Sequence, residues 1–230
     1  MDKEVPKINC IGVIMDGNRR WAKEQGLPGV GGHAAGLTKV KEIIRHAFSQ
    51  GVETVILYAF STENWNRSKE EVGYLMNLFE GALMRELAEL SKENVRVRFI
   101  GDLTYLSEKL RASIKKVEEE TARPDAKKTL VLAISYGGRA EILSAVNKLL
   151  NEGKKDVRED ELNRVLWTSD IPEPDLIIRT GGEKRLSNFL TWQSVYSELF
   201  FTDTKWPAFT KEEFDSILAE FGTRERRRGK

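Results

Sequence analysis

The first candidate functional residues of the chain lie in a short stretch that follows an apolar run at residues 11–15. That stretch reads Asp16-Gly17-Asn18-Arg19-Arg20-Trp21. A carboxylate beside guanidinium groups suits a metal-bridged diphosphate, because the acid can hold a divalent cation while the arginines bind phosphate oxygens. A glycine also lets the backbone approach such a ligand closely. The alternative is a solvent-exposed charged turn after a strand, and these residues taken alone slightly favour the turn.

Two other polar stretches follow apolar runs in the same way. One follows residues 54–59 and reads Ser61-Thr62-Glu63-Asn64-Trp65-Asn66-Arg67, and the other follows residues 175–178 and reads Arg179-Thr180-Gly181-Gly182-Glu183-Lys184-Arg185-Leu186-Ser187-Asn188. Ligands of an open α/β sheet bind at the carboxyl ends of its strands, so we expect the three loops to converge at one edge. The predicted result is a polar mouth with an acid, several arginines and hydrogen-bonding side chains.

Alternating strand and helix patterns in the sequence predict the secondary structure that carries these loops. We expect strands at 11–15, 54–59, 95–100, 130–135, 175–178 and 198–201, and helices at 37–50, 68–93, 107–120, 138–151, shortly after 160, and 209–225. The glycine-rich stretch 29–36 is expected to be a turn that leads into the helix at 37–50. The alternation predicts one α/β domain over residues 1–230, with a mainly parallel central sheet of about six strands flanked by helices.

Composition narrows the class of protein. The chain has 230 residues, of which 40% are hydrophobic and 32% charged, and its net charge of +1 gives no sign of a nucleic-acid partner. The single cysteine, Cys10, excludes an intramolecular disulfide and fits a reducing compartment. No segment approaches the roughly 20 apolar residues that span a bilayer. We therefore expect a cytoplasmic protein, with contact to the membrane surface left open.

Several common catalytic motifs are absent from the sequence. It has no phosphate-binding loop with its lysine, no Gly-x-Gly-x-x-Gly, no Cys/His metal spacing and no Gly-x-Ser-x-Gly. These absences disfavour a nucleotide kinase, a dehydrogenase, a zinc enzyme and an α/β-hydrolase. Chemistry in which the substrate itself ionises becomes more plausible when no nucleophile motif is present.

Five motifs together resemble those of the cis-prenyltransferases, the family of the undecaprenyl and dehydrodolichyl diphosphate synthases. The motifs lie at residues 15–22, 58–67, 136–139, 178–183 and 185–190, in the order and spacing of that family. The resemblance extends over residues 11–229. It implies repeated condensation of an allylic diphosphate, such as farnesyl or geranylgeranyl diphosphate, with isopentenyl diphosphate. The implied product is a Z-polyprenyl diphosphate, diphosphate is released, and the implied cofactor is Mg²⁺.

The resemblance also implies roles for individual residues. Asp16 would be the catalytic carboxylate and would hold Mg²⁺ together with Glu198. Asn64 would be the second catalytic residue, in an orienting role, because a neutral amide is a poor base. The residues implied for the allylic diphosphate are Gly17, Asn18, Arg19, Arg20, Trp21, His33, Ser61, Thr62, Glu63, Trp65 and Arg67. Those implied for isopentenyl diphosphate are Arg179, Arg185, Leu186, Ser187, Arg227 and Gly229.

Two larger features follow from the same resemblance. The basic tail at 224–230 contains Arg227-Arg228-Gly229, which matches a family motif that reaches the partner's substrate site in homodimers. The alternative for this tail is a solvated helix end favoured by the helix dipole. The helices at 37–50 and 72–90 would enclose an apolar tunnel against the sheet, although core packing also explains their apolar faces. Peripheral contact with a membrane through the product is left open.

Some positions depart from the family pattern. The family commonly has basic residues at the positions of Gly29 and Ala34 and a larger residue at that of Gly31. Arg19, where many bacterial members have glycine, is expected to supply part of the missing positive charge. Two other functions remain open: a non-catalytic subunit of a heteromeric enzyme, and a metal-dependent phosphohydrolase. The retained Asp16 argues against the first, and the small number of acids at the strand ends argues against the second.

Overall fold

The computed structural model describes residues 7–225, and within 82–92 it describes the backbone alone. The strands are β1 (Cys10–Ile14), β2 (Thr54–Ser61), β3 (Val95–Ile100), β4 (Lys128–Tyr136), β5 (Leu176–Arg179) and β6 (Glu198–Phe201). The α-helices are α1 (Asn18–Glu24), α2 (Gly29–Ser49), α3 (Lys69–Lys92), α4 (Glu108–Thr121), α5 (Gly138–Asn151), α6 (Glu159–Val165) and α7 (Lys211–Thr223). Short 3₁₀ turns are η1 (Thr62–Asn66), η2 (Leu103–Tyr105) and η3 (Trp206–Ala208).

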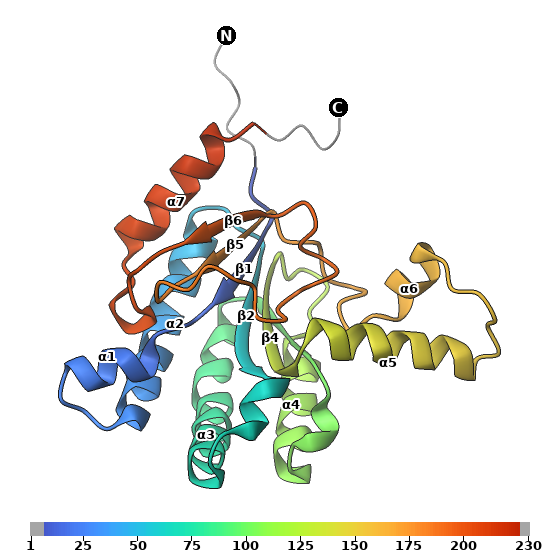
Figure 1. Ribbon diagram of the computed structural model, residues 1–230, viewed down its shortest axis with the longest axis horizontal. Coiled ribbons are helices and arrows are strands. Elements are labelled where there is room, and N and C mark those ends of the chain that lie inside the picture. Colours follow the sequence, from blue (N-terminus) through green and yellow to red (C-terminus); the bar gives the residue numbers. More distant parts are fainter. Residues whose placement is uncertain (1–6, 226–230) are drawn as a thin grey trace.

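The strands form one six-stranded sheet in the order β3-β4-β2-β1-β5-β6, and every described pairing is parallel. The carboxyl ends of all six strands therefore lie at the same edge. This confirms the predicted fold class and places the loops after β1, β2 and β5 next to one another, because β1 pairs with both β2 and β5. Figure 1 shows these strands side by side in the centre of the molecule.

Side chains alternate between the two faces of the sheet and form two cores. On one face, Val13, Leu57 and Ile178 pack in the larger cluster, to which α2, α4 and α7 contribute their apolar faces. On the other face, Ile14 and Ile177 pack against the segment that follows β5 in a second cluster. Both faces of the sheet are thus buried, as the continuous apolar strands predict.

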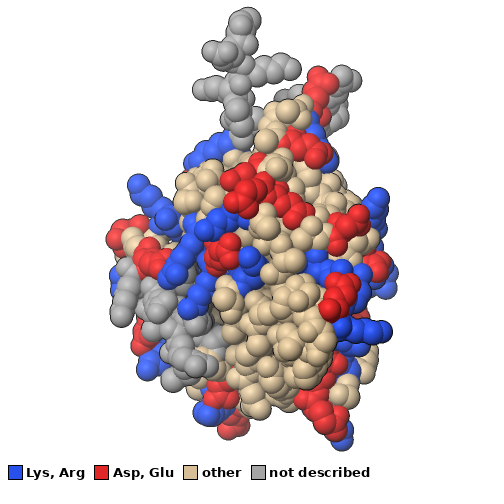
Figure 2. All heavy atoms as spheres, turned by 90° about the vertical axis from the view of Figure 1, so that its left-hand side faces the viewer, with Lys and Arg blue, Asp and Glu red and all other residues tan. Residues whose placement is uncertain are grey.

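Helices α5 and α6 form a unit of their own. They share a small cluster of Ala145, Leu149, Leu162 and Leu166. Figure 1 shows this pair projecting to the right, away from the helices that cover the sheet. On the opposite side of the molecule, Figure 2 shows Lys and Arg mixed with Asp and Glu around a large uncharged area. Within residues 7–225, no helix is long and apolar enough to cross a membrane.

The region between β1 and β2 differs from the prediction. The glycine-rich stretch is not a turn but the first two turns of α2, and a separate helix, α1, precedes it. A Cβ on Gly32 would stand 2.0 Å from the carbonyl oxygen of Asn18, and a Cβ on Gly36 would stand 2.2 Å from the Asn18 side chain. The glycines, four residues apart on one helix face, therefore allow α1 and α2 to approach closely.

Candidate active site

A cavity of about 850 Å³ opens at the carboxyl edge of the sheet and extends between α2, α3 and the strands. Its mouth is polar and its interior is apolar. The mouth is lined by Asp16, Gly17, Asn18, Arg19, Arg20, His33, Ser61, Glu63, Asn64, Arg67, Arg179, Ser187 and Asn188. The interior is lined by Leu37, Val40, Ile44, Leu57, Leu75, Leu78, Phe79, Phe99, Leu130, Leu132 and Ile134. The structure therefore contains the predicted tunnel between the two helices and the sheet.

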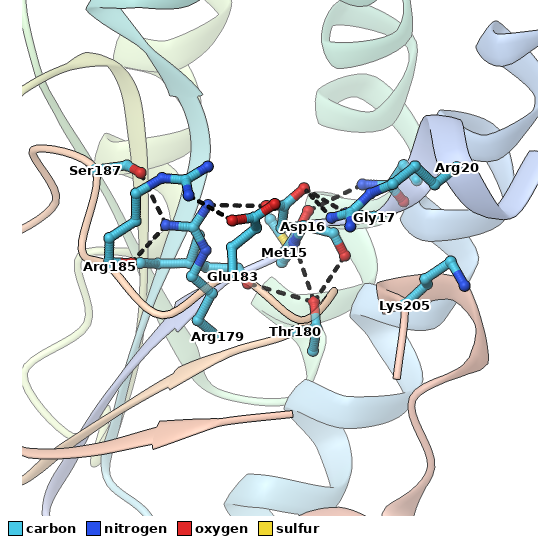
Figure 3. A network of polar contacts seen from close by, with 12 residues as sticks. Met15, Asp16, Gly17, Arg20, Arg179, Thr180, Glu183, Arg185, Ser187 and Lys205 are labelled. Carbon is cyan, nitrogen blue, oxygen red and sulfur yellow. Dashed lines mark hydrogen bonds and ion pairs between the residues drawn. The ribbon is translucent and has the colours of Figure 1, made fainter. Parts of the chain in front are cut away.

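Asp16 is the central acid of the mouth (Figure 3). Its Oδ2 accepts a 2.8 Å hydrogen bond from Arg179 Nη2, and its Oδ1 accepts one of 2.6 Å from the Gly17 N–H. Arg20 Nη2 lies 3.4 Å from Oδ1. The backbone of Asp16 is fixed by the fully buried Thr180, whose hydroxyl accepts from the Asp16 N–H and donates to the Asp16 carbonyl. The carboxylate is therefore held in one orientation by strands β1 and β5.

The pKa of Asp16 lies below its ordinary value. Burial raises this pKa, but the hydrogen bonds from Arg179 and Gly17 and the charges of Arg179 and Arg20 outweigh burial and favour the carboxylate. Asp16 is thus ionised at neutral pH and is available as a metal ligand.

The loop after β5 is shaped around the Arg179 side chain, which is 5% exposed. Arg179 Nη1 donates to the Ser187 hydroxyl at 2.8 Å and to the Arg185 carbonyl oxygen. Ser187 and Asn188 have positive φ angles of 48° and 66°, which non-glycine residues seldom adopt. Such conformations persist where the surrounding contacts require them, and they cluster at functional sites.

The loop after β2 closes another side of the mouth. Asn64 accepts from the Ser61 N–H at 3.1 Å in a reciprocal cap of η1, so its side-chain oxygen is already engaged. Glu63 accepts from Asn188 at 2.9 Å and thereby joins this loop to the loop after β5. Burial raises the pKa of Glu63, but hydrogen bonds, the first from Asn188, outweigh it and leave the pKa below its usual value. The loops that carry Asn64 and Ser187 are therefore connected directly.

A third group of charges lies beside α3. Glu71 pairs with Arg67 at 3.0 Å and with Arg19 at 3.5 Å, and it lies 3.7 Å from His33 Nε2. Burial is the main cause that lowers the pKa of His33, and Arg67 lowers it further while Glu71 opposes the change. His33 is consequently neutral at pH 7. Among the described residues its buried Nε2 has no partner within hydrogen-bond distance, and the nearest acid, Glu71, lies 3.7 Å away.

The comparisons with known proteins agree on one family. The family model described as putative undecaprenyl diphosphate synthase matches residues 14–229. The isoprenyl transferase of Neisseria gonorrhoeae is 45% identical over 220 residues, which cover 96% of this chain and 88% of that protein. The chain belongs to the undecaprenyl diphosphate synthase family. This result confirms the resemblance to the cis-prenyltransferases.

Two further relatives extend the comparison. A Pseudomonas putida protein named ditrans,polycis-undecaprenyl-diphosphate synthase, farnesyl-diphosphate specific, is 45% identical over 226 residues, covering 96% of this chain and 90% of that protein. The crystal structure of lavandulyl diphosphate synthase from Lavandula x intermedia, in complex with dimethylallyl diphosphate, matches with a TM-score of 0.93 at 34% identity. The match covers 99% of this chain and 100% of that one. The similarity to known proteins therefore extends over nearly the whole chain.

Not every residue predicted for this family's site lines the cavity. Trp21, Thr62, Trp65, Arg185 and Leu186 are not among the lining residues. Trp65 instead donates to Ser135 and packs against Phe60, which fixes η1 from behind. Arg185 pairs with Glu183 while its carbonyl binds Arg179. Arg227 and Gly229 lie outside the described residues.

The structure does not bring Glu198 to Asp16 within one chain. Glu198 begins β6 and pairs in register with Leu176 at the amino end of β5, whereas Asp16 follows the carboxyl end of β1. The two acids are therefore at opposite edges of the sheet. Glu198 accepts a 2.8 Å bond from Arg224 there. The two acids are not neighbours within one chain, because the first residue of a parallel strand lies at its amino end, and the role of Glu198 in the metal site stays a prediction.

Several residues of the site were not singled out from the sequence. Asn188 connects two loops, Glu71 gathers three basic groups, and Thr180 fixes the backbone of Asp16. Gly181 adopts a φ of 86°, and a Cβ there would stand 2.8 Å from Arg20 Nη2, so the position needs glycine. Asn188 lies in one of the family motifs, whereas Glu71 lies in the first turn of α3, where an acid is also explained by the helix N-terminus.

The donors in the mouth fit Mg²⁺ bound partly by substrate. Within residues 7–225 there is no group of three or more His, Cys, Asp or Glu side chains that could hold a metal by themselves. Asp16 supplies one ionised carboxylate whose two oxygens have accepting capacity beyond the bonds they already make. Mg²⁺ commonly takes one or two carboxylates and completes its shell with phosphate oxygens and water. The arrangement therefore suits a metal that arrives with a diphosphate.

Proposed function

We propose that this protein is a Mg²⁺-dependent cis-prenyltransferase that elongates an allylic diphosphate with isopentenyl diphosphate to give a Z-polyprenyl diphosphate. The observation that carries the proposal is one continuous cavity whose polar mouth holds Asp16 and Arg179 and whose interior is apolar. Such a cavity suits a substrate with a charged diphosphate and a growing hydrocarbon chain. Farnesyl or geranylgeranyl diphosphate fits this description as the allylic primer.

The reaction follows from the chemistry of the two substrates. The C–O bond of the allylic diphosphate breaks, and its electron pair leaves with the diphosphate. The double-bond electrons of isopentenyl diphosphate form the new C–C bond to the allylic carbon. Loss of a proton from the resulting cation creates the Z double bond, and the proton passes to a diphosphate oxygen or water because the amide of Asn64 is a poor base.

The residues of the mouth divide between the two diphosphates. The allylic diphosphate would be held by Arg19, Arg20 and Arg67 together with the neutral His33. All four line the mouth of the cavity, and Arg19 and Arg67 both pair with Glu71. Arg179 and Ser187 would hold the diphosphate of isopentenyl diphosphate, because their loop is already ordered beside Asp16. Guanidinium groups suit phosphate oxygens because they donate paired hydrogen bonds. The two reacting carbons would then meet between these groups.

Asp16 would hold Mg²⁺ on a substrate diphosphate. A bound metal would neutralise the negative charge that develops on the leaving diphosphate. Arg179 would keep the carboxylate oriented toward the mouth, and Arg20 would keep it ionised by its charge. The low pKa of Asp16 supports this role, because a protonated acid would not bind the metal.

The test is incubation of the purified protein with Mg²⁺, farnesyl diphosphate and labelled isopentenyl diphosphate, followed by chromatography of the extracted chains. We expect a series of elongated products. A single short product would instead indicate a function closer to that of the lavandulyl diphosphate synthase with the same fold. Elongation only after addition of a second protein would support the non-catalytic or heteromeric alternative, and no elongation under any condition would refute the proposal.

We also propose that the protein is a homodimer that uses its basic C-terminal tail, residues 224–230, at the partner's site. Exposed apolar side chains support a contact surface on the side of α5: Leu143 lies on α5, and Val195 and Tyr196, 71% and 61% exposed, precede β6. Each of these side chains is large, apolar and exposed, and an interface between two copies of the chain would bury them. We propose a cytoplasmic enzyme that contacts the membrane surface through its product and binds no nucleic acid.

A further inference from the structure

The motif at residues 136–139 has no role in the reaction described so far, although it lies at the carboxyl end of β4, beside the loops of the mouth. Among the described residues that line the cavity, none belongs to this motif. Any part that the motif plays in the reaction must therefore be exerted through residues of the neighbouring loops. One such residue is Asn188, which does line the mouth.

Asn188 is bound by the backbone at the start of α5. The Gly138 N–H donates to the Asn188 carbonyl oxygen at 2.7 Å, and the Arg139 N–H donates to Asn188 Oδ1 at 2.9 Å. These N–H groups belong to the first turn of the helix, where the backbone offers them no partner. Gly137, the residue before the helix, has no side chain with which to cap them. Asn188 therefore caps α5 from the loop after β5.

The amide nitrogen of Asn188 reaches the loop after β2. It donates to Glu63 Oε1 at 2.9 Å, and Glu63 precedes Asn64 in η1. A Cβ on Gly137 would stand 2.5 Å from Asn188 Nδ2 and 2.7 Å from Thr62 Oγ1. Because Gly137 has an extended backbone with a φ of −160°, its glycine is needed for space and not for backbone freedom. The loops after β2, β4 and β5 therefore meet at one amide side chain.

The residue before Asn188 is fixed at the same place. Ser187 Oγ accepts from Arg179 Nη1 at 2.8 Å. The hydroxyl of Tyr58 lies 3.2 Å from the carbonyl oxygen of Ser187 and 3.2 Å from that of Tyr136. Ser187 is thus held by β5 through Arg179, by β2 through Tyr58, and by α5 through its neighbour Asn188.

We propose that Asn188, held by the motif at 136–139, is a positioning residue that sets the distance between the two substrate loops of the mouth. This inference rests on the proposed function, since it concerns how the two diphosphates are placed relative to each other. Ser187 would bind isopentenyl diphosphate, whereas Glu63 and Asn64 lie on the loop implied for the allylic diphosphate. A reaction between two bound substrates is sensitive to displacements of about 1 Å. Asn188 acts through these neighbours and needs no contact with the reacting carbons.

The first test is Asn188→Asp, which replaces the amide nitrogen by an oxygen. The aspartate keeps the oxygen that accepts from Arg139, and the start of a helix favours its charge. Two carboxylates then face each other where Asn188 donated to Glu63. We expect kcat for elongation to fall by about tenfold or more, as for loss of a hydrogen bond to a charged group. The KM for isopentenyl diphosphate should change little, because Arg179 still binds Ser187. An unchanged kcat would overturn the proposal.

A double-mutant cycle with Glu63 isolates the contact. In Asn188→Asp combined with Glu63→Gln, the glutamine amide can donate to the new carboxylate, so the hydrogen bond returns with donor and acceptor exchanged. We expect Asn188→Asp to lower kcat by no more than about twofold when the Glu63→Gln protein is the reference. An equal loss in both backgrounds would show that Asn188 does not act through Glu63, which would also overturn the proposal.

Gly137→Ala reaches the same contact without changing Asn188 or Glu63. The extended backbone accepts alanine, but the new Cβ must displace the Asn188 amide from its present position. We expect a similar fall in kcat, which Glu63→Gln does not relieve. A Gly137→Ala protein with the kcat of the wild type would contradict the proposal. Thermal unfolding shows whether each variant is folded, and either Asn188→Asp or Gly137→Ala decides the question if the other does not fold.

Asn94 supplies a matched control at the opposite edge of the sheet. Like Asn188 it has a positive φ, 57°, and its Nδ2 donates to a carboxylate, that of Asp125, at 3.1 Å. It directly precedes β3 and is not among the described residues that line the cavity. Asn94→Asp creates the same kind of carboxylate pair there, and we expect it to keep the kcat of the wild type.

The outcomes separate this proposal from the proposed function. An equal fall of kcat in Asn94→Asp and Asn188→Asp would show that loosening of the fold, and not the position of the loops, lowers the rate. Elongation at the same rate by the wild type and by every variant would overturn the positioning role and leave the proposed function intact. Absence of elongation by the wild type would overturn both.

Discussion

Asp16 combines partial burial with three partners that favour its charged form. Because its folded pKa lies below the ordinary value of about 3.9, its contribution to stability is complete above that pH and is lost as the pH falls through the folded pKa. We therefore expect the difference in unfolding free energy between wild type and Asp16→Asn to be constant from pH 7 to about pH 5 and to shrink below about pH 4. Urea unfolding across this pH range measures it. A difference that grows on acidification would contradict the assigned pKa direction.

Position 29, beside Arg19, tests whether the allylic diphosphate lacks a charged contact in this protein. A Cβ on Gly29 would stand 3.7 Å from Arg19 Cγ, an ordinary contact distance, so position 29 lies beside Arg19 and accepts a Cβ. If the allylic diphosphate lacks one charged hydrogen bond here, Gly29→Arg should lower the KM for farnesyl diphosphate by about tenfold to a hundredfold, since such a bond contributes about 1.5–3 kcal/mol. Steady-state kinetics measure this effect. An unchanged KM would show that Arg19 already supplies the missing contact or that position 29 does not face the diphosphate.

Helix α2 shows at the element scale what the sequence could predict and what it could not. The strands were predictable because short apolar runs rich in β-branched residues, separated by helical patterns, are typical of buried parallel strands. The start of α2 was not, because glycine ordinarily ends helices and the close crossing with α1 is a tertiary contact. The limit does not apply to Glu198, because the first residue of a strand in a parallel sheet lies at the amino edge, and this position follows from the predicted strand at 198–201. Motif residues predicted the mouth well, since most of them line one cavity.

The neighbouring glycines Gly31 and Gly32 test this account of α2. Gly32→Ala would place a Cβ 2.0 Å from the Asn18 carbonyl, whereas a Cβ on Gly31 meets nothing closer than 3.6 Å. We expect Gly32→Ala to destabilise the protein by about 1–3 kcal/mol through overpacking. Gly31→Ala should instead stabilise it by up to about 1 kcal/mol, because alanine favours the helix. Denaturant unfolding distinguishes the two, and equal effects would show that the helix crossing does not require glycine.

At the scale of the whole molecule, the proposed dimer would bury exposed apolar side chains such as Tyr196, which precedes β6. Tyr196→Asp should shift the protein toward monomer, because a charge in an apolar interface loses its water without gaining a partner. Leu27→Asp is a suitable control, since Leu27 is also exposed but lies between α1 and α2. Analytical ultracentrifugation measures both. A wild type that is monomeric at all concentrations would refute the dimer.

The central claim is that Asp16 at the mouth of the tunnel performs prenyl elongation. The most direct measurement is the rate of labelled isopentenyl diphosphate incorporation by Asp16→Ala and by wild type, with farnesyl diphosphate and Mg²⁺ at saturation and with folding verified by circular dichroism. We expect wild type to form elongated Z-polyprenyl products and the folded variant to lose about 100-fold or more of the rate, as removal of electrostatic stabilisation at a leaving group predicts. A folded Asp16→Ala that elongates at the wild-type rate would contradict the account.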